Sequence, residues 1–260
     1  MHIVVCIKQV PETTEVKINP QTNTLIREGV KSIINPFDMY ALEEAVRLKE
    51  KFGGSTTVIT MGPPQADAAL REAMAMGIDE AILVSDRAFA GSDTWATSYT
   101  LSLAIKKIAN FDLILCGKQA SDGDTAQVGP GISTHLDIPQ VTYVKKIEEV
   151  KDGVMRVERM MEEGYEIIET PLPALLTVVK EINEPRMPSL KGLMRSRQAK
   201  ITHWTAKDLM VDESCIGLDG SPTRVLKIFI PAPRTGGQMI KGDTQEIVDK
   251  LVDLLRSEIS

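Results

Sequence analysis

The residues best suited to chemistry lie in a polar loop, residues 117–128, between a short apolar run and a predicted helix. The run from Leu113 to Gly117 is typical of a buried strand, and the helix is expected to begin near Val128. Free backbone N–H groups gather at the start of a helix, and the helix dipole favours negative charge there. A strand, a polar loop and a helix start therefore predict a site for the phosphate or ribose of a nucleotide.

This loop matches neither of the two common phosphate-binding motifs, because it contains no GxxxxGK(S/T) and no GxGxxG pattern. The alternative interpretation is an ordinary connection between a strand and a helix, with Asp122 and Asp124 as turn and cap residues. The spacing of the loop does not by itself separate these two interpretations.

The elements that position this loop begin with an apolar strand at residues 2–8, which is followed by Pro11. A nearly continuous apolar run is expected where helices cover both faces of a parallel sheet. Open α/β sheets bind their ligands beyond the carboxyl ends of the strands, which places Lys8 and Gln9 on the functional rim. For Lys8, a solvated strand end is the alternative.

Strands and helices then alternate along the chain. A helix is predicted to start at Asn35-Pro36-Phe37-Asp38 and to end at Gly53, because proline and aspartate favour the first turn and glycine favours helix ends. In a later helix, the hydroxyls of Thr94 and Thr97 lie near the first turn, where they either bond a phosphate or serve as caps. The other elements predicted up to residue 144 are strands at 56–61, 81–84, 113–117 and 140–144, and helices at 65–76, 94–110 and 128–136.

This alternation predicts an α/β fold with a doubly wound, mostly parallel, Rossmann-like sheet. The polar residues 13–28 predict a small excursion or hairpin. After residue 145 the pattern changes to short strands joined by turn signals such as Asp152-Gly153, and we expect these strands to form an antiparallel extension of the sheet. They are predicted at 147–150, 154–161, 165–170 and 174–179.

Regular periodicity ends near Asn183, and the following part of the chain carries one isolated leucine, Leu190, before a basic segment. A final helix is predicted at 244–259, with apolar residues along one face. Because a long segment without its own secondary structure is unusual inside a compact domain, we expect it to pack on another chain. The alternative is a terminal helix that docks on its own domain. The predicted organisation is a nucleotide-binding α/β domain at 1–186 and a C-terminal arm at 187–260.

The composition argues against several classes of function. Of the 260 residues, 43% are hydrophobic and 25% are charged, as in soluble globular proteins. A net charge of −6 argues against a nucleic-acid surface, and no apolar run is long enough for membrane insertion. The chain enters its first strand without a basic leader, so we expect a cytoplasmic protein. The three cysteines and three histidines form no CxxC, HExxH or HxH pattern, so we expect neither a disulfide framework nor a metal site.

Several short motifs occur in a fixed order along the chain. They are Val5-Cys-Ile-Lys-Gln-Val-Pro11, Asn35-Pro-Phe-Asp38 followed by Ala41-Leu-Glu-Glu-Ala45, Thr60-Met-Gly-Pro63, Ala75-Met-Gly77, Gly117-Lys-Gln-Ala120, Asp122-Gly-Asp-Thr-Ala-Gln-Val128 and Asn183-Glu-Pro-Arg186. Through the order and spacing of these motifs, the chain resembles the β subunit of electron-transferring flavoproteins over essentially its full length.

The resemblance implies a heterodimer with a larger α subunit that carries the redox flavin. In the usual form of the family, the β subunit holds a structural AMP. The positions that match the family's binding site are Cys6, Asn35, Pro36, Phe37, Asp38, Met61, Gly117, Lys118, Gln119, Asp122, Gly123, Asp124, Thr125, Ala126, Gln127 and Val128. The resemblance also implies that Leu190 lies in a recognition loop and fits an apolar pocket on a partner dehydrogenase.

Two segments, Asp122–Pro130 and Gly91–Ser98, resemble the electron-bifurcating branch of the family, in which a second FAD replaces AMP. Hydroxyls at the start of the 94–110 helix would hold the additional phosphate, and small residues in the loop would leave room for the larger cofactor. The positions added to the cofactor site are Lys8, Thr94, Ala96 and Thr97.

In that branch, NADH reduces the β-subunit FAD by hydride transfer. One electron then goes to ferredoxin or flavodoxin, and the other passes through the α-subunit flavin to an acyl-CoA dehydrogenase-type or lactate dehydrogenase-type partner. The flavin carries this chemistry, so no side chain of this chain is needed as an acid, base or nucleophile. Two alternatives stay open: an ordinary carrier with structural AMP and no nicotinamide site, and a stand-alone adenine-nucleotide sensor or hydrolase on the same sheet.

Overall fold

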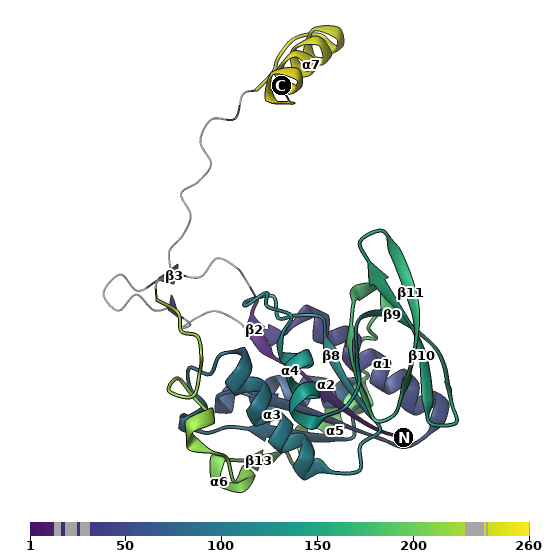
Figure 1. Ribbon diagram of the computed structural model, residues 1–260, viewed down its shortest axis with the longest axis vertical. Coiled ribbons are helices and arrows are strands. Elements are labelled where there is room, and N and C mark those ends of the chain that lie inside the picture. Colours follow the sequence, from purple (N-terminus) through teal and green to yellow (C-terminus); the bar gives the residue numbers. More distant parts are fainter. Residues whose placement is uncertain (13–16, 19–24, 27–31, 227–236, 238, 260) are drawn as a thin grey trace. The chain divides into compact units, whose positions relative to one another are not determined.

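The computed structural model describes residues 1–12, 17–18, 25–26, 32–226, 237 and 239–259. Contacts within the chain divide it into two compact units, Met1–Leu226 and Lys227–Ser260. Figure 1 shows the elements of both units, coloured along the sequence. Each unit is described by itself.

A nine-stranded sheet is the framework of the first unit, with the strand order β11-β10-β9-β12-β8-β1-β6-β7-β13. The seven strands β9, β12, β8, β1, β6, β7 and β13 pair in parallel with their neighbours in the sheet. β10 and β11 extend the sheet beyond β9 through antiparallel pairs. This arrangement confirms the predicted α/β fold with a mostly parallel sheet. The strands are β1 (His2–Cys6), β6 (Ser55–Met61), β7 (Glu80–Val84), β8 (Leu113–Gly117), β9 (Gln140–Lys151), β10 (Val154–Met161), β11 (Gly164–Pro171), β12 (Ala174–Val178) and β13 (Thr202–Trp204).

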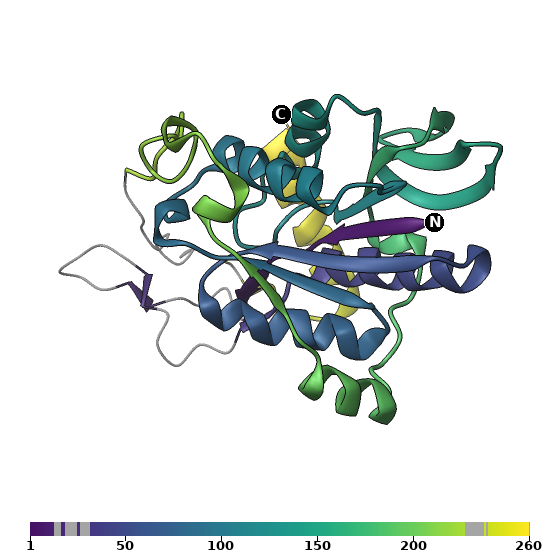
Figure 2. The ribbon, with the colours of Figure 1, turned by 90° about the horizontal axis from the view of Figure 1, so that it is seen from below.

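Helices cover both faces of the sheet (Figure 2). Buried side chains of α1 and α2 pack with Ile3 and Val5 of β1 on one face, whereas those of α3 and α4 pack with Val4 and Cys6 on the other. Successive residues of β1 thus face opposite cores, which explains its continuous apolar run. The helices are α1 (Pro36–Phe52), η1 (Pro64–Ala66), α2 (Asp67–Met76), η2 (Arg87–Phe89), α3 (Thr94–Ile108), α4 (Val128–Leu136), η3 (Lys180–Ile182), α5 (Leu190–Gln198), α6 (Ala206–Leu209), η4 (Glu213–Cys215) and α7 (Thr244–Ile259).

Two small antiparallel pairs accompany the large sheet. One joins β2 (Gln9–Pro11) to β5 (Ser32–Ile34), and the other joins β3 (Lys17–Ile18) to β4 (Leu25–Ile26). The second pair falls within the excursion predicted at 13–28, and the rest of that excursion lies outside the described residues.

Two strands differ from the sequence prediction. β9 runs without a break to Lys151, so the separate strand expected at 147–150 is the second half of one long strand. The side-chain alternation is interrupted because Tyr143 has a φ of 60° and the register with the neighbouring strands shifts nearby. β12 pairs in parallel between β8 and β9, and therefore belongs to the main sheet rather than to its antiparallel extension. An apolar run that is buried on both faces carries no sign of its direction.

The segment that follows β12 carries more structure than its lost periodicity predicted. Its helix α5 packs on α2, where Arg195 donates hydrogen bonds to the carbonyl oxygens of Met74 (2.9 Å) and Ile78 (2.7 Å). Strand β13 adds a parallel edge strand beside β7. The first compact unit therefore extends to Leu226, beyond the boundary at residue 186 that we expected from the sequence. Short elements that are held by distant parts of the chain leave no periodic apolar pattern of their own.

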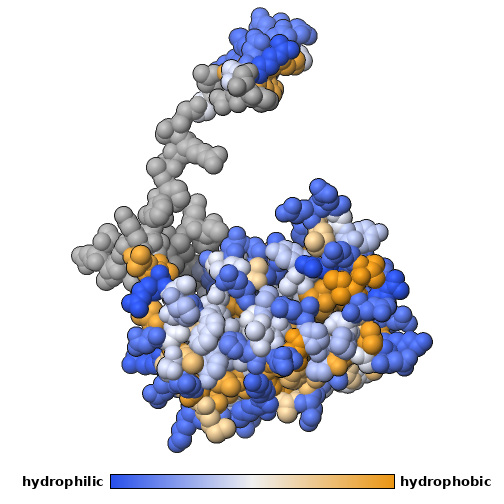
Figure 3. Space-filling view, in the orientation of Figure 1, coloured by the Kyte–Doolittle hydropathy of each residue, from blue (hydrophilic) through white to orange (hydrophobic). Residues whose placement is uncertain are grey.

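The face of the first unit seen in Figure 3 is mostly hydrophilic, with a patch of apolar side chains over the antiparallel extension. Met161 and Ile167 are among the exposed apolar side chains of these strands. Because β11 is an edge strand, this patch adjoins unpaired backbone groups as well.

In the second unit, α7 confirms the terminal helix predicted at 244–259. Five of its apolar side chains are exposed, namely Val248, Leu251, Val252, Leu254 and Leu255. The expectation that this helix packs on another chain stays a prediction. Among the described residues, no helix has both the length and the apolar character needed to cross a membrane.

Candidate nucleotide site

A cavity of about 370 Å³ lies at the carboxyl ends of β1, β6 and β8, where the starts of α1, α3 and α4 also meet. Open α/β sheets bind ligands at this edge, and the volume lies within the ~300–1,000 Å³ that is usual for ligand pockets. The loop singled out in the sequence forms one wall. The lining residues are Cys6, Ile7, Lys8, Asn35, Asp38, Met61, Ser92, Asp93, Thr94, Thr97, Leu101, Cys116, Gly117, Lys118, Gln119, Ala120, Gly123, Thr125, Ala126, Gln127, Val128 and Gly129.

A buried carboxyl group, Asp38, joins the end of β1 to the start of α1. It accepts hydrogen bonds from the backbone N–H of Lys8 (2.7 Å) and from Nδ2 of Asn35 (2.9 Å). Burial raises the pKa of Asp38 to about 7, and the hydrogen bonds from Asn35, Lys8 and Gly117 only partly oppose this shift. Both donors lie on the cavity lining, so Asp38 fixes two of its walls.

Asn35 in turn holds the predicted loop. Its Nδ2 donates to the carbonyl oxygen of Gln119 (2.8 Å), and its Oδ1 accepts from the backbone N–H of Ser121 (3.0 Å). Asn35 is 1% exposed, so these bonds are shielded from water. The start of the loop is therefore fixed to α1 by the side chain that precedes this helix.

Gly117 is required by the close packing of β8 against the start of α1. A Cβ atom at this position would lie 2.3 Å from Oδ1 of Asp38 and 2.6 Å from the carbonyl carbon of Phe37. Such distances do not occur in folded proteins, so another residue would push the loop away from α1. By contrast, no described heavy atom lies within 4 Å of a Cβ built on Gly123.

The middle of the loop bends through two left-handed residues that are not glycine. Asp124 has a φ of 52° and Ala126 has a φ of 54°. The bend is held by a bond from the backbone N–H of Asp124 to the carbonyl oxygen of Ala120 (2.8 Å) and by a contact of Gln119 Nε2 with the Asp124 carboxylate. Each left-handed residue costs about 1–2 kcal/mol, and such strain is typical of functional loops.

The start of α4 offers free backbone donors to the cavity. Among the described residues, no side chain caps its first turn, and the N–H groups of Val128 and Gly129 belong to residues that line the cavity. An uncapped helix start next to a cavity is the geometry that binds phosphate. The alternative reading of the loop assigned the caps to its aspartates, but neither Asp122 nor Asp124 caps α4.

The start of α3 is capped in the ordinary way. The Asp93 carboxylate accepts from the N–H groups of Trp95 (2.9 Å) and Ala96 (3.1 Å). The hydroxyl of Thr94 bonds Oε1 of Gln127 (3.1 Å), which ties the starts of α3 and α4 together. The two hydroxyls predicted to face a ligand, those of Thr94 and Thr97, belong to lining residues.

Two lysines bring positive charge to the rim. Lys8 Nζ lies 2.6 Å from Oδ1 of Asp122, a pair that crosses from β1 to the loop and is partly exposed. Lys118 Nζ lies over the rings of Phe37 (5.9 Å) and Tyr143 (5.1 Å). Both lysines line the cavity and favour an anionic ligand.

Most residues predicted for the cofactor site line this cavity. Five do not: Pro36, Phe37, Ala96, Asp122 and Asp124. Pro36 and Phe37 form the opening turn of α1, and Ala96 is buried inside α3. Asp122 and Asp124 bond the side chains of Lys8 and Gln119, which do line the cavity.

Sequence reasoning missed some of the lining. Most of the missed residues are small or apolar, types that indicate packing rather than binding. Each of them lies within two residues of a predicted site residue, or one helical turn away from it. Their position next to predicted site residues was therefore the signal that could have found them. They are Ile7, Ser92, Asp93, Leu101, Cys116, Ala120 and Gly129.

Leu190, predicted as a recognition residue, begins α5 and is 76% exposed. Ser189 caps this helix by accepting from the N–H of Gly192 (3.0 Å). Met187 and Met194 are also exposed nearby in the sequence. Leu190 is therefore part of a short apolar surface rather than an isolated side chain.

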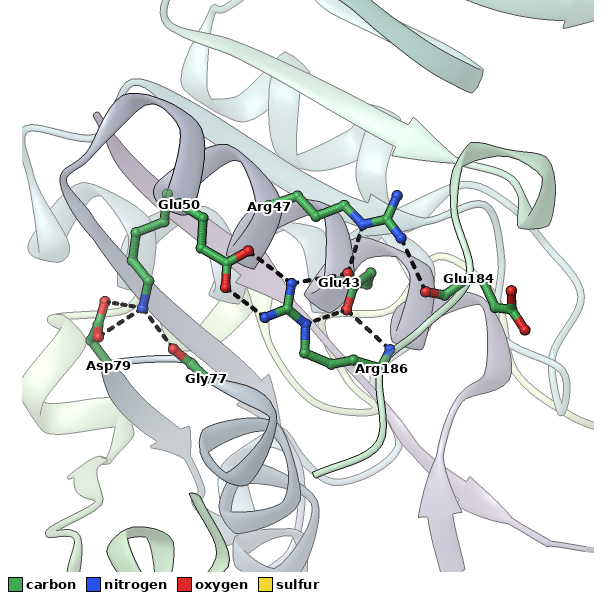
Figure 4. Close-up of polar contacts among 8 residues, drawn as sticks. Glu43, Arg47, Glu50, Gly77, Asp79, Glu184 and Arg186 are labelled. Carbon is green, nitrogen blue, oxygen red and sulfur yellow. Dashed lines mark hydrogen bonds and ion pairs between the residues drawn. The ribbon is translucent and has the colours of Figure 1, made fainter. Parts of the chain in front are cut away.

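A charged network fastens the segment before Leu190 to α1 (Figure 4). Arg186 bonds Glu43 through Nε (2.8 Å) and Glu50 through Nη1 (2.6 Å), and Arg47 bonds Glu43 from the other side (2.6 Å). The Glu43 side chain is 2% exposed, so it depends on these partners. Although burial alone would raise the pKa of Glu43, the hydrogen bonds from Arg186 and Arg47 hold it below its ordinary value.

A parallel sheet with helices on both faces, a cavity at its carboxyl edge and an uncapped helix start define the class of α/β folds that bind nucleotides. A family model described as "Electron transfer flavoprotein domain" matches residues 22–209 of the chain. The chain belongs to the electron transfer flavoprotein family and corresponds to its β subunit.

Curated relatives align with nearly the whole chain. An "Electron transfer flavoprotein subunit beta" of Thermoanaerobacterium thermosaccharolyticum is 56% identical, with 99% of this chain and 98% of that protein covered. A "Caffeyl-CoA reductase-Etf complex subunit CarD" of Acetobacterium woodii is 52% identical, with 99% of each chain covered. A "Protein FixA" of Azotobacter vinelandii is 52% identical, with 90% of this chain and 86% of that protein covered.

Proposed function

We propose that this chain pairs with an electron transfer flavoprotein α subunit, binds FAD in the cavity and takes electrons from NADH. Bound there, FAD would accept a hydride from NADH and release two electrons singly, one to ferredoxin or flavodoxin and one through the α-subunit flavin to an acyl-CoA dehydrogenase-type or lactate dehydrogenase-type partner. The residues of this chain bind and orient the cofactor.

The observation that carries this proposal is the uncapped start of α4 at the end of a fixed loop. The N–H groups of Val128 and Gly129 supply donors for a phosphate, and the helix dipole adds positive potential. The loop cannot drift from these donors, because Asn35 bonds it at Gln119 and Gly117 packs against α1. These contacts support the proposal, because a loop that is already ordered lowers the entropic cost of binding.

The proposal of a dinucleotide rests on the second helix start. The hydroxyls of Thr94 and Thr97 line the cavity beside α4, and the Thr94–Gln127 bond holds the two helix starts together. The Thr94 hydroxyl already donates its proton to Gln127, so the Thr97 hydroxyl at one helix start and the free N–H groups at the other supply the donors for two phosphates. Lys8 and Lys118 on the rim favour the same charge.

The name of one relative supports the proposed class of partner. The protein from Acetobacterium woodii is named as a subunit of a caffeyl-CoA reductase–Etf complex. We extend this only to the general class, an enzyme that acts on an acyl-CoA. The exposed Leu190 surface is our proposed contact for such an enzyme.

A structural AMP in place of FAD is the second candidate, and the size of the cavity favours it. The volume of about 370 Å³ is near the lower end of the usual range for ligand pockets. A mononucleotide in this cavity would use the same loop, but the chain would then have no direct reaction with NADH.

Counting the cofactors of the purified heterodimer separates these candidates. FAD and AMP are released by denaturation and quantified by chromatography against the protein concentration, and NADH is added to a second sample without oxygen. We expect two FAD per heterodimer and loss of the oxidised-flavin absorbance with NADH. One FAD and one AMP, with no bleaching, would establish the second candidate.

A substitution in the loop tests the location of the site. Asp124→Trp or Gln127→Trp fills the space beside the start of α4, so we expect the β-subunit cofactor to be lost while the α-subunit flavin remains. Asp152→Trp is the matched control, because Asp152 is also left-handed (φ 51°) but lies in the turn between β9 and β10. Unchanged flavin content in the loop variants would refute the assignment.

A further inference from the structure

Two of the three cysteines meet at the floor of the cavity. Cys6 ends β1 and Cys116 lies in β8, and the two residues are direct partners in the register of these parallel strands. Both side chains belong to the same apolar cluster, and both residues line the cavity. Their exposed fractions are 8% and 6%, so the cavity is their route to solvent.

The geometry of the pair places two thiols side by side. Adjacent strands lie about 4.8 Å apart, and directly paired residues project their side chains to the same face of the sheet. The neighbouring Cys6 side chain, together with burial, raises the pKa of the Cys116 thiol. Both cysteines are free, and the proposed flavin chemistry uses neither of them.

The surroundings limit what the pair can bind. In the part of the chain that the structure describes, no group of three or more histidine, cysteine, aspartate or glutamate side chains could hold a metal ion. A structural zinc ion needs four protein ligands, so two thiols do not satisfy it. An atom that needs only two sulfur ligands from the protein does fit the pair.

We propose that Cys6 and Cys116 form a dithiol site for trivalent organoarsenicals. A compound with one organic group, written R–As=O, forms two As–S bonds with the pair. Two S–H bonds and the As=O bond are broken, and the two protons leave with the oxygen as one water molecule. Arsenic stays trivalent and both sulfurs keep their oxidation state, so the reaction needs no oxidant or reductant.

The adduct also excludes the nucleotide, a consequence that rests on the proposed function. Cys116 immediately precedes Gly117, whose backbone has no room to shift toward α1. An arsenic centre with its organic group would therefore occupy the cavity beside the first residues of the loop.

Phenylarsine oxide tests the dithiol site in the heterodimer after its β-subunit nucleotide has been removed. We expect one adduct on this chain by intact mass, with the loss of two titratable thiols. A monothiol should leave the adduct in place and dithiothreitol should remove it, since a ring with two As–S bonds is displaced only by another dithiol. Absence of the adduct, or its removal by a monothiol, would overturn the proposal.

Single substitutions locate the adduct. Cys6→Ala and Cys116→Ala should each abolish the stable adduct, whereas Cys215→Ala should retain it, because Cys215 lies outside the cavity. A stable adduct that persists in Cys116→Ala or disappears in Cys215→Ala contradicts the assignment.

A protection experiment addresses the nucleotide separately. FAD or AMP added before phenylarsine oxide should slow adduct formation at least tenfold if the nucleotide occupies the same cavity. An adduct that forms at the same rate with nucleotide bound would refute the exclusion and the nucleotide assignment, but it would leave the dithiol site standing.

Discussion

At the scale of single residues, the site depends on polar groups that are buried and fully used. The side chains of Asp38 and Asn35 take part in four hydrogen bonds: one joins them to each other, and the other three reach Lys8 after β1 and Gln119 and Ser121 in the loop. A buried polar group without a partner costs about 1–3 kcal/mol, so these contacts also specify where the loop lies. Asp38 and Gly117 allow two specific predictions.

Asp38 should make the stability of the chain depend on pH. Its pKa in the folded state is about 7, above the ordinary value of 3.8. Between pH 3.8 and about pH 7, Asp38 is therefore protonated in the folded state and ionised in the unfolded state. The resulting stabilisation is complete below pH ~4 and disappears as the pH rises through ~7, with an upper limit of about 4 kcal/mol. Asp38→Asn cannot titrate, so the wild type should lose stability relative to this variant between pH 5 and pH 8.

Urea unfolding of the two proteins at several pH values measures this difference. Asp38→Asn also places an amide N–H₂ group near hydrogen-bond donors. We therefore expect the variant to lose about 1–3 kcal/mol of unfolding free energy at every pH, in addition to the pH-dependent difference. A difference between the two proteins that does not change from pH 5 to pH 8 would contradict the raised pKa.

Gly117→Ala should disrupt the loop. The new methyl group would overlap Asp38 and the backbone of Phe37, and overpacking of this kind costs about 1–3 kcal/mol or more. We expect lower thermal stability and weaker nucleotide binding. Gly123→Ala is the control, because its methyl group meets no described atom within 4 Å and its stability should change by less than about 1 kcal/mol. Equal behaviour of the two variants would argue against the packing described for Gly117.

How far the sequence predicts the site is clear from the same residues. The loop at 117–128 could be found because a strand, a polar loop and a helix start are consecutive in the chain. The bonds from Asn35 to Gln119 and Ser121 span 84 and 86 positions, and no local pattern encodes such distances. The raised pKa of Asp38 likewise results from burial by distant elements, while its residue type indicated only a helix start.

At the scale of elements, buried parallel strands and the longer helices could be predicted because their apolar patterns are local and regular. β9 could not be predicted as one strand, since its side-chain alternation is interrupted near Tyr143. The direction of β12 and the edge strand β13 are set by contacts with β8, β9 and β7, which lie far away in sequence. Elements that depend on such contacts were therefore missed or misplaced.

The contact between α1 and the segment before α5 allows a prediction at this scale. Arg186→Ala removes the bonds to Glu43 and Glu50, and leaves a buried carboxylate with fewer partners. We expect a loss of about 1–3 kcal/mol at pH 7 by urea unfolding. The loss should shrink as the pH falls, because the depressed pKa of Glu43 stabilises the fold only while this carboxylate is charged.

Lys146→Ala is the control for this network. Lys146 lies 3.4 Å from Glu148 and its side chain is 60% exposed, so its removal should cost less than about 1 kcal/mol. Arg186→Ala should also weaken the binding of the proposed partner enzyme if the network positions the Leu190 surface. If both the stability and the partner binding of Arg186→Ala are unchanged, the network neither stabilises the fold nor positions the Leu190 surface.

At the scale of the whole molecule, the chain has two compact units and only the first contains the cavity. α7 exposes an apolar face of the kind that partner chains usually cover. Leu251→Asp should therefore weaken association with the α subunit about tenfold or more, while the unfolding of the first unit stays unchanged. Lys250→Asp introduces the same residue at an exposed charged position and is the control. Equal affinities of both variants for the α subunit would contradict a role of α7 in the heterodimer.

A crystal structure of the heterodimer would show whether the loop at 117–128 holds a nucleotide. We expect density for the adenosine and phosphates of FAD in the cavity, with phosphate oxygens within hydrogen-bonding distance of the N–H groups of Val128 or Gly129. Density for solvent alone in the cavity of a heterodimer that carries its full complement of cofactor would contradict it.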